Sequence, residues 1–152
     1  MTQQVFEQSI TINAMATLVE RCCTERELMH RWLNPALRCD PVGDWDTGLG
    51  GKTRFVLQVP VWEPTLYSTV VERSPGLVVW EFTGFFRGRD RWECQPEGQK
   101  TRLLNRFEFQ PSNPLVAFGF RTFAARWTRR DMEAQLRRLK RVAEELQSLR
   151  SS

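Results

Sequence analysis

The pattern of hydrophobic and polar positions predicts one long helix near the end of the chain, over residues 113–149. Asn113 can cap this helix with its side-chain oxygen, and Pro114 suits the first helical position, where its missing N–H is not needed. A continuous helix of this length would span roughly 50 Å, so we expect a bend near Gly119 or Trp127. One face is apolar at helical spacing and must pack against the rest of the chain; its residues are Leu115, Phe118, Phe123, Trp127, Met132, Leu136, Leu139, Ala143 and Leu146.

A first strand and two short helices are predicted at the start of the chain. Residues 5–12 alternate between apolar and polar side chains, which is typical of a strand. Residues 15–23 form a predicted short helix. A second one reaches residue 32 from Thr24, which with Glu27 has the spacing of a capping box. Six further strands, separated by turn residues, are predicted at 36–42, 53–59, 65–72, 77–83, 89–95 and 101–109.

This order of elements predicts an α+β fold in which an antiparallel sheet of about seven strands packs against the long helix. A chain of 152 residues is long enough to bury one core, and we assign residues 1–152 to a single domain. The first strand is expected to pair beside the last strand or to close the far edge of the sheet.

Charge and cysteine content narrow the functional classes. Residues 112–152 carry nine Lys or Arg and four Asp or Glu, so the net charge of +4 belongs to the long helix. No apolar run has the length of a membrane span, and the N-terminus does not resemble a signal peptide, so we expect a cytoplasmic protein. The four cysteines have no metal-ligand spacing and are expected to be buried free thiols, and we expect no metal and no cofactor.

Three segments and the long helix resemble the helix-grip superfamily, the START-related SRPBCC group. Residues 5–14 are similar to its first strand and the turn that follows, residues 28–35 to its segment with a Trp after the second short helix, and residues 43–51 to its glycine-rich hairpin loop. The group includes proteins of the birch-pollen allergen type, START lipid-transfer domains and polyketide cyclase-like proteins. The chain departs from it at Met15, where many relatives have proline. The resemblance implies a curved antiparallel sheet that grips the long helix, with a cavity for an apolar ligand between them.

The large side chains of the inner sheet face and the helix either line such a cavity or fill it as an ordinary core. Asn105 lies among apolar residues of a strand and needs a hydrogen-bond partner, either a ligand oxygen or a neighbouring side chain. As ligand-binding walls we predict Phe55, Leu57, Trp80, Phe82, Trp92, Asn105, Phe107, Phe123 and Trp127.

The strand alternation also divides the polar residues between two faces. Ser68 and Asp90 are expected inside with Asn105, Tyr67 is unassigned, and Asp90 is expected to pair with an arginine in the segment 87–91. On the outer face of the sheet we expect a row of cross-strand charge pairs, called the charged ladder. A register shifted by one residue would instead point Arg106 and Glu108 into the cavity. The ladder comprises Glu81, Arg91, Glu93, Arg102, Arg106 and Glu108.

These observations leave three functional hypotheses. The first is binding or transport of a hydrophobic small molecule such as a lipid, isoprenoid, quinone, pigment or polyketide. The second is a cyclase- or dehydratase-type enzyme, which needs an acid–base pair in the cavity; the candidates are Asp90, Tyr67, Glu81 and Arg106. No catalytic residue is assigned. Two titratable side chains that converge on the cavity would be needed to support the enzyme hypothesis. The only histidine, His30, is interpreted as a surface or capping residue.

The third hypothesis uses the basic side of the long helix as a contact surface for nucleic acid. Only Trp127 accompanies the basic residues, so base stacking has little support and no nucleic-acid partner is expected. The same side is alternatively a surface for transient contact with an anionic membrane. Its basic residues are Arg129, Arg130, Arg137, Arg138, Lys140 and Arg141.

Overall fold

The computed structural model describes residues 3–58, 64–119 and 125–151, and the side chains of 3–58, 64–116 and 128–150. Seven strands form one antiparallel sheet in the order β1-β7-β6-β5-β4-β3-β2. The strands are β1 (Gln4–Ile12), β2 (Leu37–Pro41), β3 (Lys52–Leu57), β4 (Thr65–Ser74), β5 (Leu77–Gly84), β6 (Phe86–Glu97) and β7 (Lys100–Pro111). The helices are α1 (Ala16–Thr24), α2 (Arg26–Trp32), α3 (Pro114–Gly119) and α4 (Ala125–Ser151).

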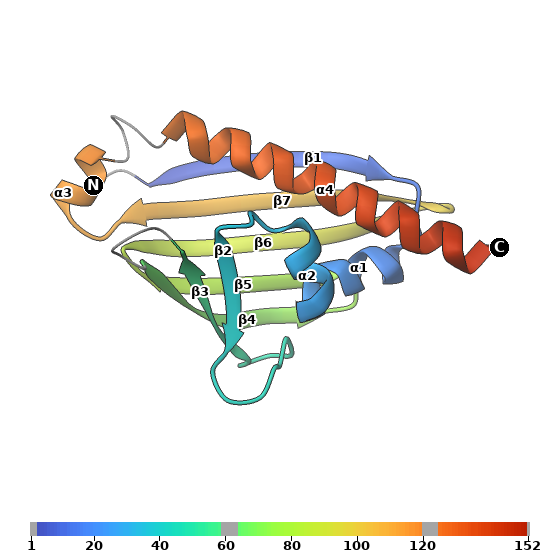
Figure 1. The fold of residues 1–152 in the computed structure, drawn as a ribbon, viewed down its shortest axis with the longest axis horizontal. Helices are drawn as coiled ribbons and strands as arrows, with labels where there is room; N and C mark the ends of the chain where they lie inside the picture. Colours follow the sequence, from blue (N-terminus) through green and yellow to red (C-terminus); the bar gives the residue numbers. More distant parts are fainter. Residues whose placement is uncertain (1–2, 59–63, 120–124, 152) are drawn as a thin grey trace.

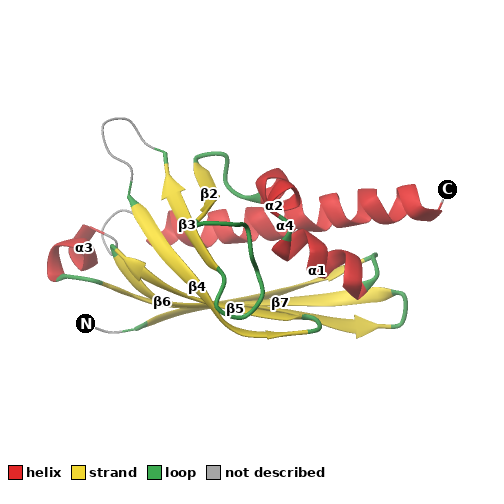
Figure 2. Ribbon diagram, turned by 90° about the horizontal axis from the view of Figure 1, so that it is seen from below, coloured by secondary structure: helices red, strands yellow, loops and turns green. Residues whose placement is uncertain are grey.

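The sheet curves around one face, and α4 lies across that face together with α1 and α2 (Figures 1 and 2). The first strand, β1, pairs antiparallel with the last strand, β7, which selects one of the two arrangements that the sequence left open. The predicted α+β helix-grip fold is therefore confirmed. A Cβ atom on Gly88 of β6 would overlap the backbone carbonyl of Glu108, so the close approach of β6 and β7 requires a glycine there.

The register of the late strands agrees with the predicted division into two faces. Arg106 lies on the outer face, where its Nη1 is 2.6 Å from Glu7 Oε2 and its Nε donates to Glu108. Its neighbour Asn105 is buried on the inner face. Because side chains alternate along a strand, this pair of neighbours fixes which face of β7 points toward α4.

A packed core occupies one end of the space between helix and sheet. The part of α4 from Leu136 onward, called its second half below, contributes Leu136 and Leu139. These pack in one cluster with Leu18 of α1 and Leu103 of β7. The indole nitrogen of Trp32 donates to the backbone oxygen of Cys22 at 2.8 Å, which joins α2 to α1. All four cysteines are buried and free, as the sequence predicted.

The helix boundaries confirm one capping prediction and correct another. The Asn113 side-chain oxygen accepts a hydrogen bond from the backbone N–H of Val116 at 2.9 Å, so α3 begins as predicted. The helical region is divided: α3 ends at Gly119 and α4 begins at Ala125. Thr24 does not cap the second helix.

Thr24 instead ends α1, and its hydroxyl donates to the backbone oxygen of Glu20 at 2.9 Å. This local bond competes with capping of the next helix, and Glu25 stands at the N-cap of α2 without a side-chain hydrogen bond. No helix in the described part of the chain is long and apolar enough to cross a membrane.

Candidate ligand-binding cavity

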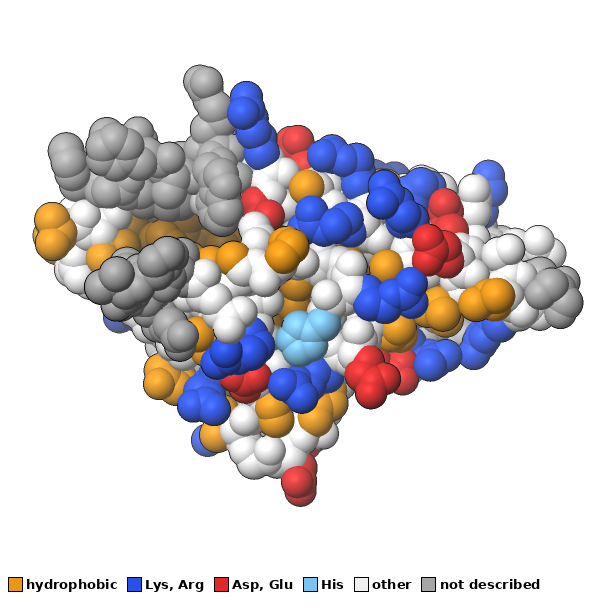
Figure 3. Space-filling model, in the orientation of Figure 1, with side chains coloured by type: hydrophobic (Ala, Val, Ile, Leu, Met, Phe, Trp, Pro, Cys, Tyr) orange, Lys and Arg blue, Asp and Glu red, His pale blue; other side chains and the backbone are white. Residues whose placement is uncertain are grey.

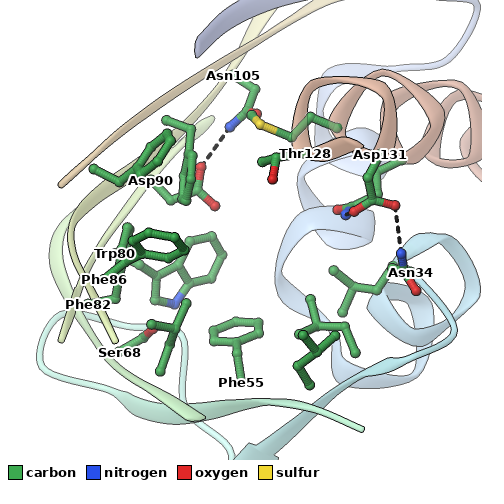
Figure 4. Close-up of a pocket in the computed structure, with 18 of the residues that line it drawn as sticks. Asn34, Phe55, Ser68, Trp80, Phe82, Phe86, Asp90, Asn105, Thr128 and Asp131 are labelled. Atoms are coloured by element: carbon green, nitrogen blue, oxygen red, sulfur yellow. Dashed lines mark hydrogen bonds between the residues drawn. The ribbon is translucent and has the colours of Figure 1, made fainter. Parts of the chain in front are cut away.

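A cavity of about 490 Å³ lies between the curved sheet and the first half of α4. Its volume is in the range of small-molecule sites, roughly 300–1,000 Å³. Figure 4 shows the sheet residues Phe55, Trp80 and Phe82 on one side and Asn34 and Asp131 on the other. The lining is mainly apolar, and its aromatic residues are Trp32, Phe55, Trp80, Phe82, Phe85, Phe86, Trp92, Phe107 and Phe109.

The cavity exists because the two halves of α4 carry different side chains toward the sheet. Thr128, Asp131, Met132 and Gln135 line the cavity from the first half, and three of these four side chains are polar. The packed cluster of α1, α2 and the second half of α4 closes the opposite end. Hydrophobic side chains are visible in a hollow on this side of the molecule (Figure 3).

Seven of the nine predicted wall residues line this cavity. They are Phe55, Leu57, Trp80, Phe82, Trp92, Asn105 and Phe107. Phe123 and the side chain of Trp127 lie outside the described residues. The sheet therefore brings the predicted side chains together, and their contact with a ligand stays a prediction.

Asp90 is the carboxyl group on the sheet side of the cavity. Its Oδ2 accepts a hydrogen bond from Trp92 Nε1 at 2.9 Å, and its Oδ1 accepts one from Asn105 Nδ2 at 2.8 Å. Burial raises the pKa of Asp90 to about 6, although both hydrogen bonds favour the ionised form. Asp90 can therefore hold or release a proton near neutral pH, inside an aromatic cavity.

The predicted pairing of Asp90 with an arginine is wrong. Arg89 and Arg91 flank it on β6, and alternation turns both to the outer face. There Arg89 pairs with Glu81 at 3.2 Å, and Arg91 is 3.4 Å from Glu93. The partners of Asp90 are instead Trp92 and Asn105, and the sequence pattern placed Asn105 on the same face without pairing the two.

Asp131 on α4 is a second carboxyl group on the cavity, and it was missed in the sequence. Its Oδ1 accepts a hydrogen bond from Asn34 Nδ2 at 2.8 Å, and its Oδ2 accepts one from Gln135 Nε2 at 2.6 Å. Arg138 Nη2 lies 4.0 Å from Asp131 Oδ1. The spacing of Thr128, Asp131 and Gln135 places them along one stripe of a helix, and this polar stripe beside the apolar face was the available signal.

The other candidate acid–base residues lie away from the cavity. Tyr67 is 56% exposed, and on the outer sheet face Glu81 pairs with Arg89 and Arg106 pairs with Glu7. His30 is exposed at the surface (Figure 3), and its Nε2 accepts a hydrogen bond from the backbone N–H of Cys39 at 3.2 Å. Burial lowers the pKa of His30. The described residues contain no group of His, Cys, Asp and Glu that could hold a metal ion.

Part of the basic side of α4 serves the fold itself. Arg138 Nε donates to the backbone oxygen of Trp32, and Lys140 Nζ donates to that of Thr11, both at 2.8 Å. The Arg129 guanidinium lies 5.0 Å from the centre of the Phe6 ring. Exposed Arg130, Arg137 and Arg141 remain on this side, and their contact with a membrane stays a prediction.

A curved antiparallel sheet around a long C-terminal helix is the helix-grip fold. A family model described as polyketide cyclase / dehydrase and lipid transport matches residues 3–144. The chain belongs to this family. No curated protein is similar enough to give a significant match.

Several solved structures are similar to this fold. The aromatase/cyclase Zhui from Streptomyces sp. R1128 has a TM-score of 0.72 at 15% identity, with 94% of each chain covered. Protein CV1439 from Chromobacterium violaceum has a TM-score of 0.70 at 14% identity, covering 92% of this chain and 96% of that one. TTHA0849 from Thermus thermophilus has a TM-score of 0.68 at 16% identity, covering 92% of this chain and 97% of that one. At these identities the likeness concerns the fold.

Proposed function

We propose that the protein binds a hydrophobic small molecule in the cavity between the sheet and α4. The observation that carries this proposal is the cavity itself, about 490 Å³ in volume and walled mainly by apolar side chains, many of them aromatic. Removing apolar ligand area from water contributes about 25 cal/mol per Å² before ordering costs. On the sheet side, Asp90, Asn105 and Ser68 supply polar groups that would orient a ligand among the apolar walls.

Native mass spectrometry of protein purified without detergent tests this proposal. We expect a stoichiometric extra mass that leaves on denaturation, and organic extraction then identifies the ligand class. The bare protein mass, obtained even after incubation with a total lipid and pigment extract, would contradict the proposal and favour a cavity that only contracts or fills with water.

A cyclase- or dehydratase-type enzyme is the second candidate, and Asp90 is the observation that favours it. Two carboxyl groups line the cavity from opposite sides, Asp90 on β6 and Asp131 on α4 (Figure 4). A carboxyl group with a pKa of about 6 can donate a proton to a substrate oxygen near neutral pH. Asp90 would be the acid, and the carboxylate of Asp131 would be the base.

The two candidates differ in what happens to the bound molecule. An enzyme would release a product that differs from the added compound by loss of water or by a ring closure. Asp90→Asn should then retain binding and lose conversion. Recovery of the unchanged compound from the wild-type protein after many hours would contradict the enzyme candidate and support binding without conversion.

A further inference from the structure

Trp80, a residue of the cavity wall, has an indole N–H that no acceptor in the described chain meets. Trp80 is 4% exposed and lines the cavity, and its indole nitrogen is buried without a hydrogen-bond partner among the described residues. The indole nitrogens of Trp32, Trp45 and Trp92, by contrast, each donate to an oxygen at 2.8–3.0 Å. An unpaired buried donor is costly, so a ligand acceptor that reaches the Trp80 N–H would remove this cost.

The surroundings of Trp80 add further polar groups to the same wall. Ser68 of β4 is 4% exposed and also lines the cavity. It is diagonal to Trp80 in the β4–β5 register, a separation that a tryptophan side chain can bridge. Thr53 stands opposite Ser68 on β3, and its buried hydroxyl likewise lacks a partner within the described chain. A single acceptor oxygen placed here would meet an indole N–H and a serine hydroxyl.

The charge of the cavity restricts what kind of oxygen fits. Asp90 and Asp131 line the same cavity, and its described lining contains no Lys, Arg or His. A carboxylate on the ligand would meet these carboxyl groups in a site of low dielectric, which is unfavourable. A neutral carbonyl oxygen accepts the indole hydrogen bond without that repulsion.

We propose that Trp80 and Ser68 form a subsite for a neutral carbonyl oxygen, so that the cavity selects apolar ketones or quinones over hydrocarbons and fatty acids of similar size. This inference rests on the proposed binding function and names the ligand class. The ligand's apolar rings would occupy the aromatic cavity, and its carbonyl oxygen would accept from Trp80 Nε1.

Three rigid probes of nearly equal shape test the subsite: fluorene, fluorenone and fluorene-9-carboxylate. We expect the wild-type protein to bind fluorenone about tenfold more tightly than fluorene, and the carboxylate more weakly than either. Trp80→Phe changes the cavity wall, so the readout is the ratio of the two affinities: the variant should bind fluorenone and fluorene about equally tightly. Trp45→Phe is the matched control. It makes the same substitution at a tryptophan outside the cavity, whose indole N–H donates to Thr24.

Infrared spectroscopy of bound fluorenone gives a second readout, separate from the affinities. The carbonyl stretching frequency should be lower in the wild-type complex than in a dry hydrocarbon solvent, and it should rise again in Trp80→Phe. Equal affinity for fluorene and fluorenone, an unshifted carbonyl band or tighter binding of the carboxylate would overturn the inference while leaving the binding function in place. Failure of all three probes to bind would instead contradict the binding function for molecules of this size.

Discussion

The two halves of α4 face the same sheet, but one packs into a filled core and the other borders a cavity. In the second half, Leu136, Leu139 and Ala143 are between 0 and 3% exposed and pack into the core formed with α1, α2 and the sheet. In the first half, Thr128 and Asp131 line a cavity of about 490 Å³. One helix therefore contributes both to stability and to the candidate site.

The difference teaches that a cavity can be built by removing apolar contacts from half of an interface. Protein interiors normally pack with few voids larger than a water molecule, so an aromatic cavity needs walls that hold it open. Here α1 and α2 support α4 at the packed end, and the curved strands support Phe55 and Trp80 at the other. Each half can be tested separately.

The largest expected effect is on stability, from truncation at the packed end. Leu139→Ala should lower the free energy of unfolding by about 2–5 kcal/mol, because a fully buried leucine leaves a void that its neighbours fill only partly. Met132→Ala on the cavity side should cost clearly less, since its side chain already borders empty space. Denaturant unfolding of both variants measures the contrast, and equal losses would mean that the cavity end is as tightly packed as the core.

The next effect is a pH dependence that belongs to Asp90. Its pKa is raised by burial from 3.8 to about 6, so the folded protein binds this proton more tightly than the unfolded chain does. The stability that Asp90 contributes is therefore fully present below about pH 4 and is lost as the pH rises through 6. Over that window the stability of the wild-type protein relative to Asp90→Asn should fall by up to about 3 kcal/mol.

Unfolding of both proteins at intervals from pH 4 to 7 measures this difference. Asp131, the other carboxyl group on the cavity, is present in both proteins, so the comparison isolates the contribution of Asp90. Parallel stability profiles for the two proteins would show that the Asp90 carboxyl group titrates at its ordinary pKa and is well hydrated.

The same two halves explain what the sequence could predict. Strand alternation and helical spacing depend on local periodicity, so they identified the elements and placed Phe55, Trp80 and Asn105 on the inner face, while the resemblance to the helix-grip superfamily gave their arrangement. The partner of Asp90 depends on the pairing of β6 with β7 in one register, which no single segment contains. Asp131 was missed because a polar residue beside the apolar stripe of a helix is usually solvated. It lines the cavity only because the space between α4 and the sheet is not filled by side chains.

A smaller effect is expected from filling the cavity. Thr128→Phe places a ring in the space below the first half of α4, so fluorene should bind at least about tenfold more weakly, a loss of about 1.4 kcal/mol. Stability should change by less than about 1.5 kcal/mol, because the ring enters existing space. Arg137→Phe on the exposed side of the same helix is the matched control and should leave fluorene affinity unchanged. Unaltered binding in Thr128→Phe would place the ligand elsewhere.

The smallest effect is expected at the outer face of the sheet, and it tests the register on which the cavity walls depend. The Arg106 side chain is 43% exposed and pairs with Glu7 and Glu108 at the surface, where solvent screens the interaction. Arg106→Ala should change neither the unfolding midpoint nor fluorene affinity beyond measurement error. Asn105→Ala, one position earlier, should destabilise the protein because it removes a donor from buried Asp90. The reverse result, with binding lost in Arg106→Ala and Asn105→Ala silent, would mean that β7 is shifted by one residue and that its charged ladder faces the ligand.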